Sequence, residues 1–148
     1  MIYIAHRGNM SGPTSGENNP SYIDAALDEG YHAEIDIRVI DGNLYLGHDT
    51  CQYDVDLQWL ENRKDRLWIH CKNLESVEFF HGTEYNYFWH EEDTLTITSK
   101  GYLWVYPGKQ PIRNSIAVMP EIYNDNITGC VGVCTDFVLK YAKNKQGE

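Results

Sequence analysis

Short apolar segments with strand-like patterning recur along this chain, and the spacing between them limits the folds that it can adopt. Only the first three leave room for a following helix, because the later connections are short. A full (β/α)₈ barrel typically needs about 250 residues, so a chain of 148 residues cannot place a helix after every strand. The expected principal strands lie near residues 2–7, 33–39, 67–72, 85–90, 94–99, 102–106, 115–120 and 129–135.

Helix and turn signals fall mainly in the first half of the chain. Asn19 is suited to cap a helix over about 20–29, because an Asn side chain accepts hydrogen bonds from the first free backbone N–H groups. Asp41-Gly42 predicts a hairpin that returns through residues 44–47. With no repeat, low-complexity segment or linker, residues 1–148 are expected to form one domain. Further helices are expected after Asp56, after Asn73 and over 137–144.

The charge balance restricts the partners of the protein. Twelve Lys and Arg residues against 22 Asp and Glu residues give a net charge of −10. This disfavours both nucleic acid, which binds basic surfaces, and anionic lipid. An anionic substrate would need local positive charge in its own site. No apolar run is long enough for a membrane span and no signal peptide is visible, so we expect a cytoplasmic protein.

Polar side chains gather at the carboxyl ends of the expected strands, where parallel α/β proteins build their active sites. Alternation places Glu34 and Asp36 on one face of their strand, as it does the pair His70 and Lys72 on another. Each residue alone has an ordinary structural explanation, but charges that point into a core are rare unless they are paired. The set therefore favours a functional site: His6, Arg7, Glu34, Asp36, His48, His70 and Lys72.

Four segments in chain order carry a family pattern: Ile4-Ala5-His6-Arg7-Gly8, Glu17-Asn18, Glu34-Ile35-Asp36 and Gly47-His48-Asp49. This pattern resembles that of the glycerophosphodiester phosphodiesterase family, specifically over about the first 50 residues and more loosely afterwards. The resemblance implies a phosphatidylinositol-phospholipase-C-like TIM barrel that hydrolyses a phosphodiester. Combined with the strand count, it predicts an α/β fold: a reduced TIM-type (β/α) barrel with about eight strands and few helices around the later strands.

The resemblance also implies roles for individual residues. One departure concerns the metal site, because the family usually has a third carboxylate ligand two residues before the lysine, where this chain has His70. The implied roles are catalytic for His6 and His48, substrate- or phosphate-binding for Arg7, Lys72, Glu17 and Asn18, and metal-binding for Glu34 and Asp36, with His70 as a candidate third ligand.

A divalent metal ion is the expected cofactor. Two carboxylates favour Mg²⁺ or Ca²⁺, whereas an imidazole ligand from His70 would move the preference toward Mn²⁺ or Zn²⁺. The expected partner is a small-molecule phosphodiester. Two histidines can hold opposite protonation states near neutral pH, so we assign His6 and His48 to the acid and base roles without deciding which is which.

Two alternatives remain open. A phospholipase-D-like lyase on the same barrel would release a cyclic phosphate, and a non-catalytic barrel would bind phosphate without turnover. Trp89-His90 and Trp104 are weaker candidates for the pocket wall, and Lys109 for a phosphate contact. The helix-poor side of the barrel needs a cover, for which we expect either aromatic side chains or a second copy of the chain in a homo-oligomer.

Overall fold

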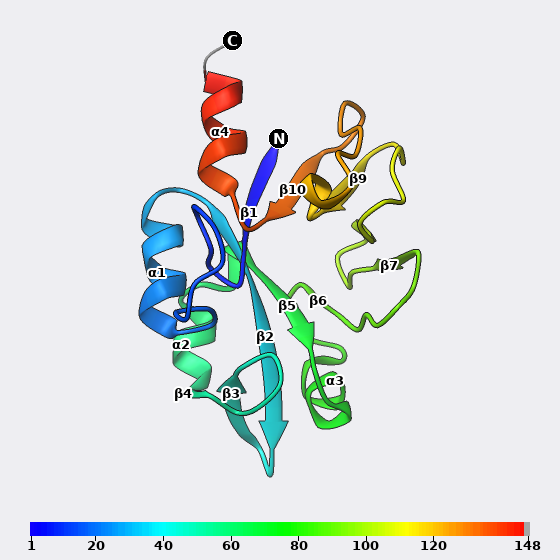
Figure 1. Cartoon of the computed structure of the whole chain (residues 1–148). Coiled ribbons are helices and arrows are strands. Elements are labelled where there is room, and N and C mark those ends of the chain that lie inside the picture. The colour runs from blue at the N-terminus through cyan, green and yellow to red at the C-terminus, as the bar shows by residue number, and fades with distance from the viewer. Residues whose placement is uncertain (147–148) are drawn as a thin grey trace.

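Parallel strands form the centre of the fold (Figure 1). The computed structural model describes residues 1–146. Seven strands pair parallel to their neighbours in the sheet. From one end of this parallel run to the other they are β6 (Tyr87–Phe88), β5 (Leu67–Cys71), β2 (His32–Ile40), β1 (Ile2–His6), β10 (Gly132–Thr135), β9 (Ser115–Val118) and β8 (Leu103–Val105).

The long strand β2 joins this run to a hairpin. Its first part lies between β1 and β5, and its end pairs antiparallel with β3 (Asn43–Leu46), which pairs in turn with β4 (Tyr53–Val55). The hairpin follows the prediction, whereas β4 was not expected from the sequence. The register places His6 beside Glu34 in the β1–β2 pair and Asp36 beside His70 in the β2–β5 pair.

The sheet curls but does not close into a full barrel. Its last strand, β7 (Leu95–Ile97), runs antiparallel to β8. Between the two ends of the curl, Ser99 N–H donates to the Tyr87 carbonyl at 2.8 Å and the Thr96 hydroxyl to the Trp89 carbonyl at 3.0 Å. No strand pairing joins β6 to β7 in residues 1–146. The predicted TIM-type barrel is thus confirmed only as a curled α/β sheet, and its closure is not found in the described residues.

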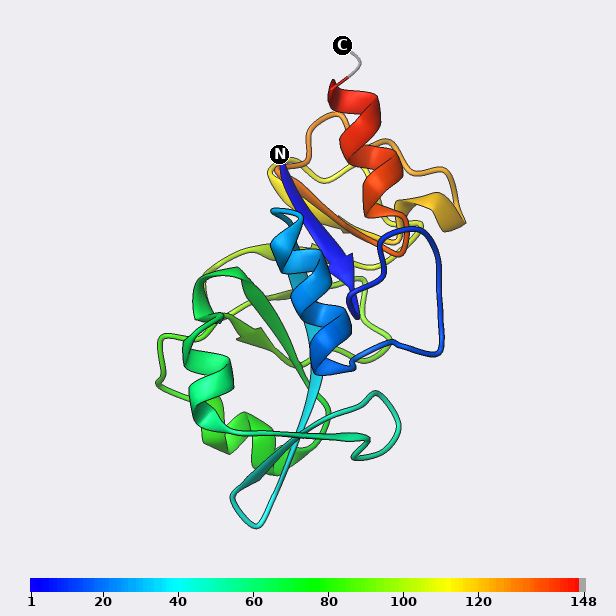
Figure 2. The same ribbon diagram turned by 90° about the vertical axis from the view of Figure 1, so that its left-hand side faces the viewer.

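Helices cover the first half of the curl. Asn19, Asp56 and Asn73 cap the first three helices through their side chains, as predicted. Figure 2 shows α1 and α4 lying outside the strands near β1. Between β6 and β10, the only helical element in the described chain is the 3₁₀ turn η2 (Pro120–Ile122). This confirms the scarcity of helices around the later strands. The helices are α1 (Pro20–Asp28), α2 (Leu57–Glu61), α3 (Leu74–Phe80) and α4 (Val138–Gln146), with the 3₁₀ turn η1 at Lys64–Arg66.

Two apolar clusters lie on opposite faces of the sheet. The outer cluster packs residues such as Ile35 and Ile37 against the helices. The inner cluster fills the curl and includes Ile4 and Trp68. Since side chains alternate along a strand, residues two positions later on β1 and β5 share this inner face. The inner cluster is therefore an apolar floor beneath His6 and His70.

The length and hydropathy of the helices bear on membrane insertion. Within residues 1–146, none of them combines the length and the apolar character that crossing a bilayer requires.

Shortening a side chain of the outer apolar cluster should show how much this cluster contributes to the free energy of unfolding. Ile35 is fully buried, so Ile35→Ala should lower the free energy of unfolding by about 2–5 kcal/mol, through lost burial and a residual cavity. The same change at Ile97, which is 61% exposed, should alter it by less than about 0.5 kcal/mol. Urea denaturation measures both, and equal losses at the two positions would contradict this account of the core.

Candidate functional site

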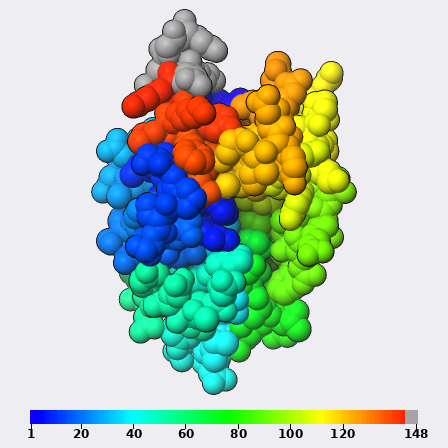
Figure 3. Space-filling model, in the orientation of Figure 1, coloured from blue at the N-terminus to red at the C-terminus, as the bar shows by residue number. Residues whose placement is uncertain are grey.

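A cavity of about 460 Å³ opens at the carboxyl ends of the parallel strands. The molecule is hollowed between the blue loop after β1 and the green and yellow segments of the second half (Figure 3). Six of the nine residues predicted for the site line this cavity: His6, Arg7, Glu34, His48, His70 and Lys72.

Two buried carboxylates and an imidazole form the centre of the site. Glu34 and Asp36 are 2% and 0% exposed. His70 Nδ1 lies 3.6 Å from Glu34 Oε2 and 3.4 Å from Asp36 Oδ1. One candidate ligand atom from each residue lies within 4.8 Å of the other two, a spacing that could hold a metal ion.

The backbone carbonyl of His90 orients the His70 ring. It lies 3.1 Å from His70 Nε2, which is placed to donate a hydrogen bond to it. When Nε2 carries the proton of a neutral imidazole, the Nδ1 lone pair faces Glu34 and Asp36. Metal-binding histidines usually have such a second contact, which fixes the tautomer that ligates.

Asn18 and Arg7 hold the Asp36 carboxylate from the other side. Asn18 Nδ2 donates to Asp36 Oδ2 at 2.9 Å, and Asn18 Oδ1 accepts from the Asp36 backbone N–H at 3.0 Å. Arg7 Nε lies 3.1 Å from the same Oδ2. Fully buried Asn18 thus supports the cluster and does not line this cavity.

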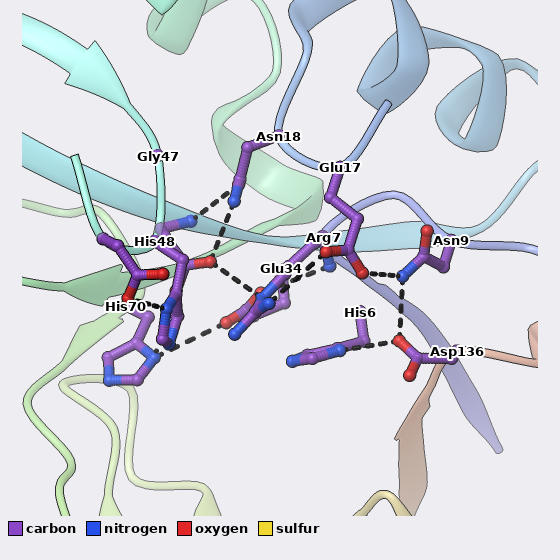
Figure 4. Close-up of polar contacts among 12 residues, drawn as sticks. His6, Arg7, Asn9, Glu17, Asn18, Glu34, Gly47, His48, His70 and Asp136 are labelled. Carbon is purple, nitrogen blue, oxygen red and sulfur yellow. Dashed lines mark hydrogen bonds and ion pairs between the residues drawn. The ribbon is translucent and has the colours of Figure 1, made fainter. Parts of the chain in front are cut away.

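His6 is paired with an aspartate from the far end of the chain. Its Nδ1 lies 2.7 Å from Asp136 Oδ1, which also accepts from Asn9 Nδ2 at 2.9 Å (Figure 4). The same Asn9 nitrogen donates to Glu17 Oε2 at 2.6 Å. This chain of contacts fixes the His6 ring and leaves its Nε2 as the nitrogen free for chemistry.

Arg7 occupies a sharp turn after β1. Its backbone is left-handed, with φ 55°, and its N–H donates to Glu34 Oε1 at 3.3 Å. Its Nη1 reaches Glu17 Oε1 at 3.4 Å. Glu17 therefore positions Arg7 and Asn9. Together with Asn18 it lines an adjoining cavity of about 510 Å³, which also includes Arg7 and His48.

The loop after β3 presents His48 to the cavity. At Gly47, where φ is 154°, an added Cβ would lie 1.9 Å from the Thr50 carbonyl oxygen, so this position requires glycine. Arg38 Nη2 donates to the His48 carbonyl at 2.6 Å and holds the loop. The His48 side chain is 38% exposed, and its Nδ1 lies 2.8 Å from Asp49 Oδ1.

The remaining predicted residues have different positions. Lys72 lines the cavity, and no ion pair of its ammonium group is found among the side chains of residues 1–143. Trp104 is buried and forms part of the wall. Trp89 is 38% exposed, and neither it nor exposed Lys109 lines this cavity.

The pKa values of the central groups reflect their pairing. Burial alone would lower the pKa of His70, but the Asp36 and Glu34 carboxylates outweigh it and raise that pKa to about 9. Burial alone would raise the pKa of Asp36, yet His70 and Arg7 hold it well below its usual range. The pKa of His6 is raised, because its hydrogen bond to Asp136 outweighs the opposite effect of burial.

Three residues that contribute to the site are not among the nine that the sequence predicted: Asp136, His90 and Asn9. Asp136 directly follows the last strand, so the rule that selected the other strand-end residues also fits it. His90 ends the segment predicted as a strand over 85–90, and we considered it only as pocket wall. Asn9 lies in the loop after β1, where no periodic signal distinguishes one amide from another.

Comparisons with models of known protein families, with curated proteins and with solved structures give no match for this chain. The resemblance to the glycerophosphodiester phosphodiesterases, which depends on short motifs, stays a prediction.

The raised pKa of His70 predicts a pH-dependent stability in the presence of a chelator. A group with a pKa of about 9 in the folded state and about 6.5 when unfolded stabilises the fold fully below pH 6.5. This contribution, on the order of 1–3 kcal/mol, should disappear as the pH rises from 6.5 to 9.

Urea denaturation at several pH values measures this loss of stability. His70→Gln should flatten that part of the pH dependence, whereas His81→Gln, at an exposed histidine, should keep it. The same pH dependence in His70→Gln as in the wild type would show that His70 does not carry this effect.

Proposed function

We propose that this protein is a metal-dependent phosphodiesterase that hydrolyses a glycerophosphodiester or a related small phosphodiester by general acid–base catalysis. The observation that carries the proposal is the convergence of His6, His48, Arg7 and Lys72 on one cavity that also holds the Glu34–Asp36–His70 cluster. Phosphodiester cleavage needs a base, an acid and positive charge at the phosphoryl group. This cavity offers side chains for each of these requirements.

The cluster of Glu34, Asp36 and His70 has the donors that a divalent cation requires. Asp36 Oδ1 is buried without a hydrogen-bond partner, and the His70 tautomer fixed by His90 directs a lone pair to the same place. With His70 as a ligand, the preference moves from Mg²⁺ or Ca²⁺ toward Mn²⁺ or Zn²⁺. A bound ion would supply Lewis-acid stabilisation of charge on the phosphoryl oxygens.

The two histidines would transfer the protons. The Asp136 carboxylate stabilises the protonated form of His6, so we assign His6 as the general acid that protonates the leaving oxygen. We assign the base to His48, because the half-exposed imidazole lies across the cavity on a different loop. Deprotonation of water or of a neighbouring substrate hydroxyl by His48 would start the reaction.

Arg7 and Lys72 would bind the phosphate. Arg7 already has carboxylates at Nε and Nη1, and no contact of its Nη2 is found in the described chain. That nitrogen and the Lys72 ammonium are therefore available for phosphoryl oxygens. Their position also addresses the charge problem, since a protein of net charge −10 can bind an anion where cationic groups are concentrated.

Hydrolysis of glycerophosphocholine and of bis(4-nitrophenyl) phosphate tests the proposal. We expect activity with Mn²⁺ or Zn²⁺, little in EDTA, and a loss of at least 100-fold in His48→Ala because the base is removed. No activity with Mg²⁺, Ca²⁺, Mn²⁺ or Zn²⁺ would favour the non-catalytic phosphate-binding barrel. A cyclic phosphate that persists would favour the lyase, whereas a linear monoester is the expected product.

A second experiment tests the acid role of His6. Asp136→Asn removes the charge that raises the pKa of His6, so the alkaline limb of the pH–rate profile should move to lower pH. Asp41→Asn, a matched change on the exposed β2–β3 turn, should leave the profile unchanged. A shift of the acidic limb instead would identify His6 as the base and contradict this assignment.

A further inference from the structure

Buried polar atoms without hydrogen-bond partners concentrate at the cavity. Among the side chains of residues 1–143 these atoms are Arg7 Nε, Asp36 Oδ1, both ring nitrogens of His90, and Asn86 Oδ1. All but the last belong to residues of the site. An unpaired buried polar group costs about 1–3 kcal/mol, so its presence in a native structure requires an explanation.

For Arg7 Nε and Asp36 Oδ1, charged groups of the cluster itself compensate for the missing hydrogen bonds. Arg7 Nε is 3.1 Å from Asp36 Oδ2, and Asp36 Oδ1 is 3.4 Å from His70 Nδ1. The His90 imidazole differs, because neither of its ring nitrogens has a hydrogen-bond partner. Its side chain is 8% exposed, and the Asp93 carboxylate that lies 3.6 Å from Nδ1 belongs to a side chain that is 60% exposed. The proposed metal and proton-transfer groups leave this ring unused.

His90 lies where it could contact a substrate in the cavity. It follows β6 at the carboxyl end of the sheet, and it lines the cavity beside Trp104 and Tyr106. Tyr106 packs edge-on against the ring, with 5.4 Å between centroids, and the His70 ring lies 6.4 Å away. Aromatic contacts thus hold the imidazole, while its nitrogens have no hydrogen-bond partner.

The charges around His90 indicate which part of a substrate it would meet. Asp93 lies close to Nδ1, and Glu91 and Glu92, the next two residues along the chain, line the same cavity. These carboxylates would repel a phosphoryl oxygen, which Arg7 and Lys72 are better placed to bind. An uncharged hydroxyl group on the alcohol arm of a diester is not repelled, and it accepts a hydrogen bond from an imidazole N–H.

We propose that His90 determines specificity by donating a hydrogen bond to a hydroxyl oxygen on the alcohol arm, which packs against Trp104 and Tyr106. This inference deepens the proposed function and rests on it: it names His90 as the residue that would select a hydroxylated alcohol arm. A site that presents a buried donor to a substrate hydroxyl rejects the analogue without it, because the donor is then left unpaired.

Calorimetric titration with two symmetric diesters tests the proposal, because identical arms remove any ambiguity of orientation. Bis(2-hydroxyethyl) phosphate carries the hydroxyl groups, and diethyl phosphate lacks them. In Mn²⁺ buffer we expect the wild type to bind the hydroxylated diester at least about tenfold more tightly, the effect of one good hydrogen bond. This preference should be lost in His90→Phe and partly kept in His90→Gln, which retains a donor.

His81→Phe is the matched control, because His81 is exposed and lies outside the cavity. It should keep the wild-type preference. Thermal unfolding checks that each variant is folded, and His90→Gln provides the comparison if the phenylalanine does not fit. No preference in the wild type, or an equal preference in folded wild type and His90 variants, would overturn the role of His90.

Hydrolysis in the same samples, followed by phosphorus NMR, separates this inference from the proposed function. Preferential binding that depends on His90 without hydrolysis would support the His90 contact and contradict the phosphodiesterase. Hydrolysis with no preference would contradict the His90 contact alone. If neither diester bound, the His90 contact would be contradicted, and hydrolysis of glycerophosphocholine would still decide the proposed function.

Discussion

The buried carboxylates of Glu34 and Asp36 are the constraint on which the rest of the site depends. Both project from β2 into the curl of the sheet, where an uncompensated charge is costly. Three neighbours of Asp36 offset that cost: Asn18 donates to it, Arg7 pairs with it, and His70 faces it. Arg7 and His70 also belong to the site. The groups that stabilise the buried Asp36 carboxylate are therefore among those that we propose bind a phosphate and a metal.

The curled sheet makes this concentration of charge feasible in a short chain. Parallel pairing in register brings the ends of β1, β2 and β5 to one level, so His6, Glu34, Asp36 and His70 meet without long connections. The outer apolar cluster packs against the helices, and the inner apolar cluster lies beneath the site. The later strands contribute wall residues through short loops, and the sheet remains open between β6 and β7.

Much of this arrangement follows from local sequence patterns. Alternation along β2 and β5 identified the inward carboxylates and His70, and the capping residues located the first three helices. What could not be read locally depends on contacts between distant segments. The antiparallel direction of β7 and the open edge beside it are set by tertiary pairing. The partner of His6 is Asp136, 130 residues away, and no periodicity connects the two. The unpaired ring of His90 depends likewise on neighbours from other loops.

Anomalous diffraction from crystals of the protein soaked in Mn²⁺ would test the central claim most directly. The account predicts one strong peak in the cavity at coordination distance, about 2.0–2.3 Å, from Glu34, Asp36 and His70 Nδ1. Absence of a peak at saturating Mn²⁺, or a peak with all three side chains beyond coordination distance, would contradict the claim that these buried groups form a metal centre.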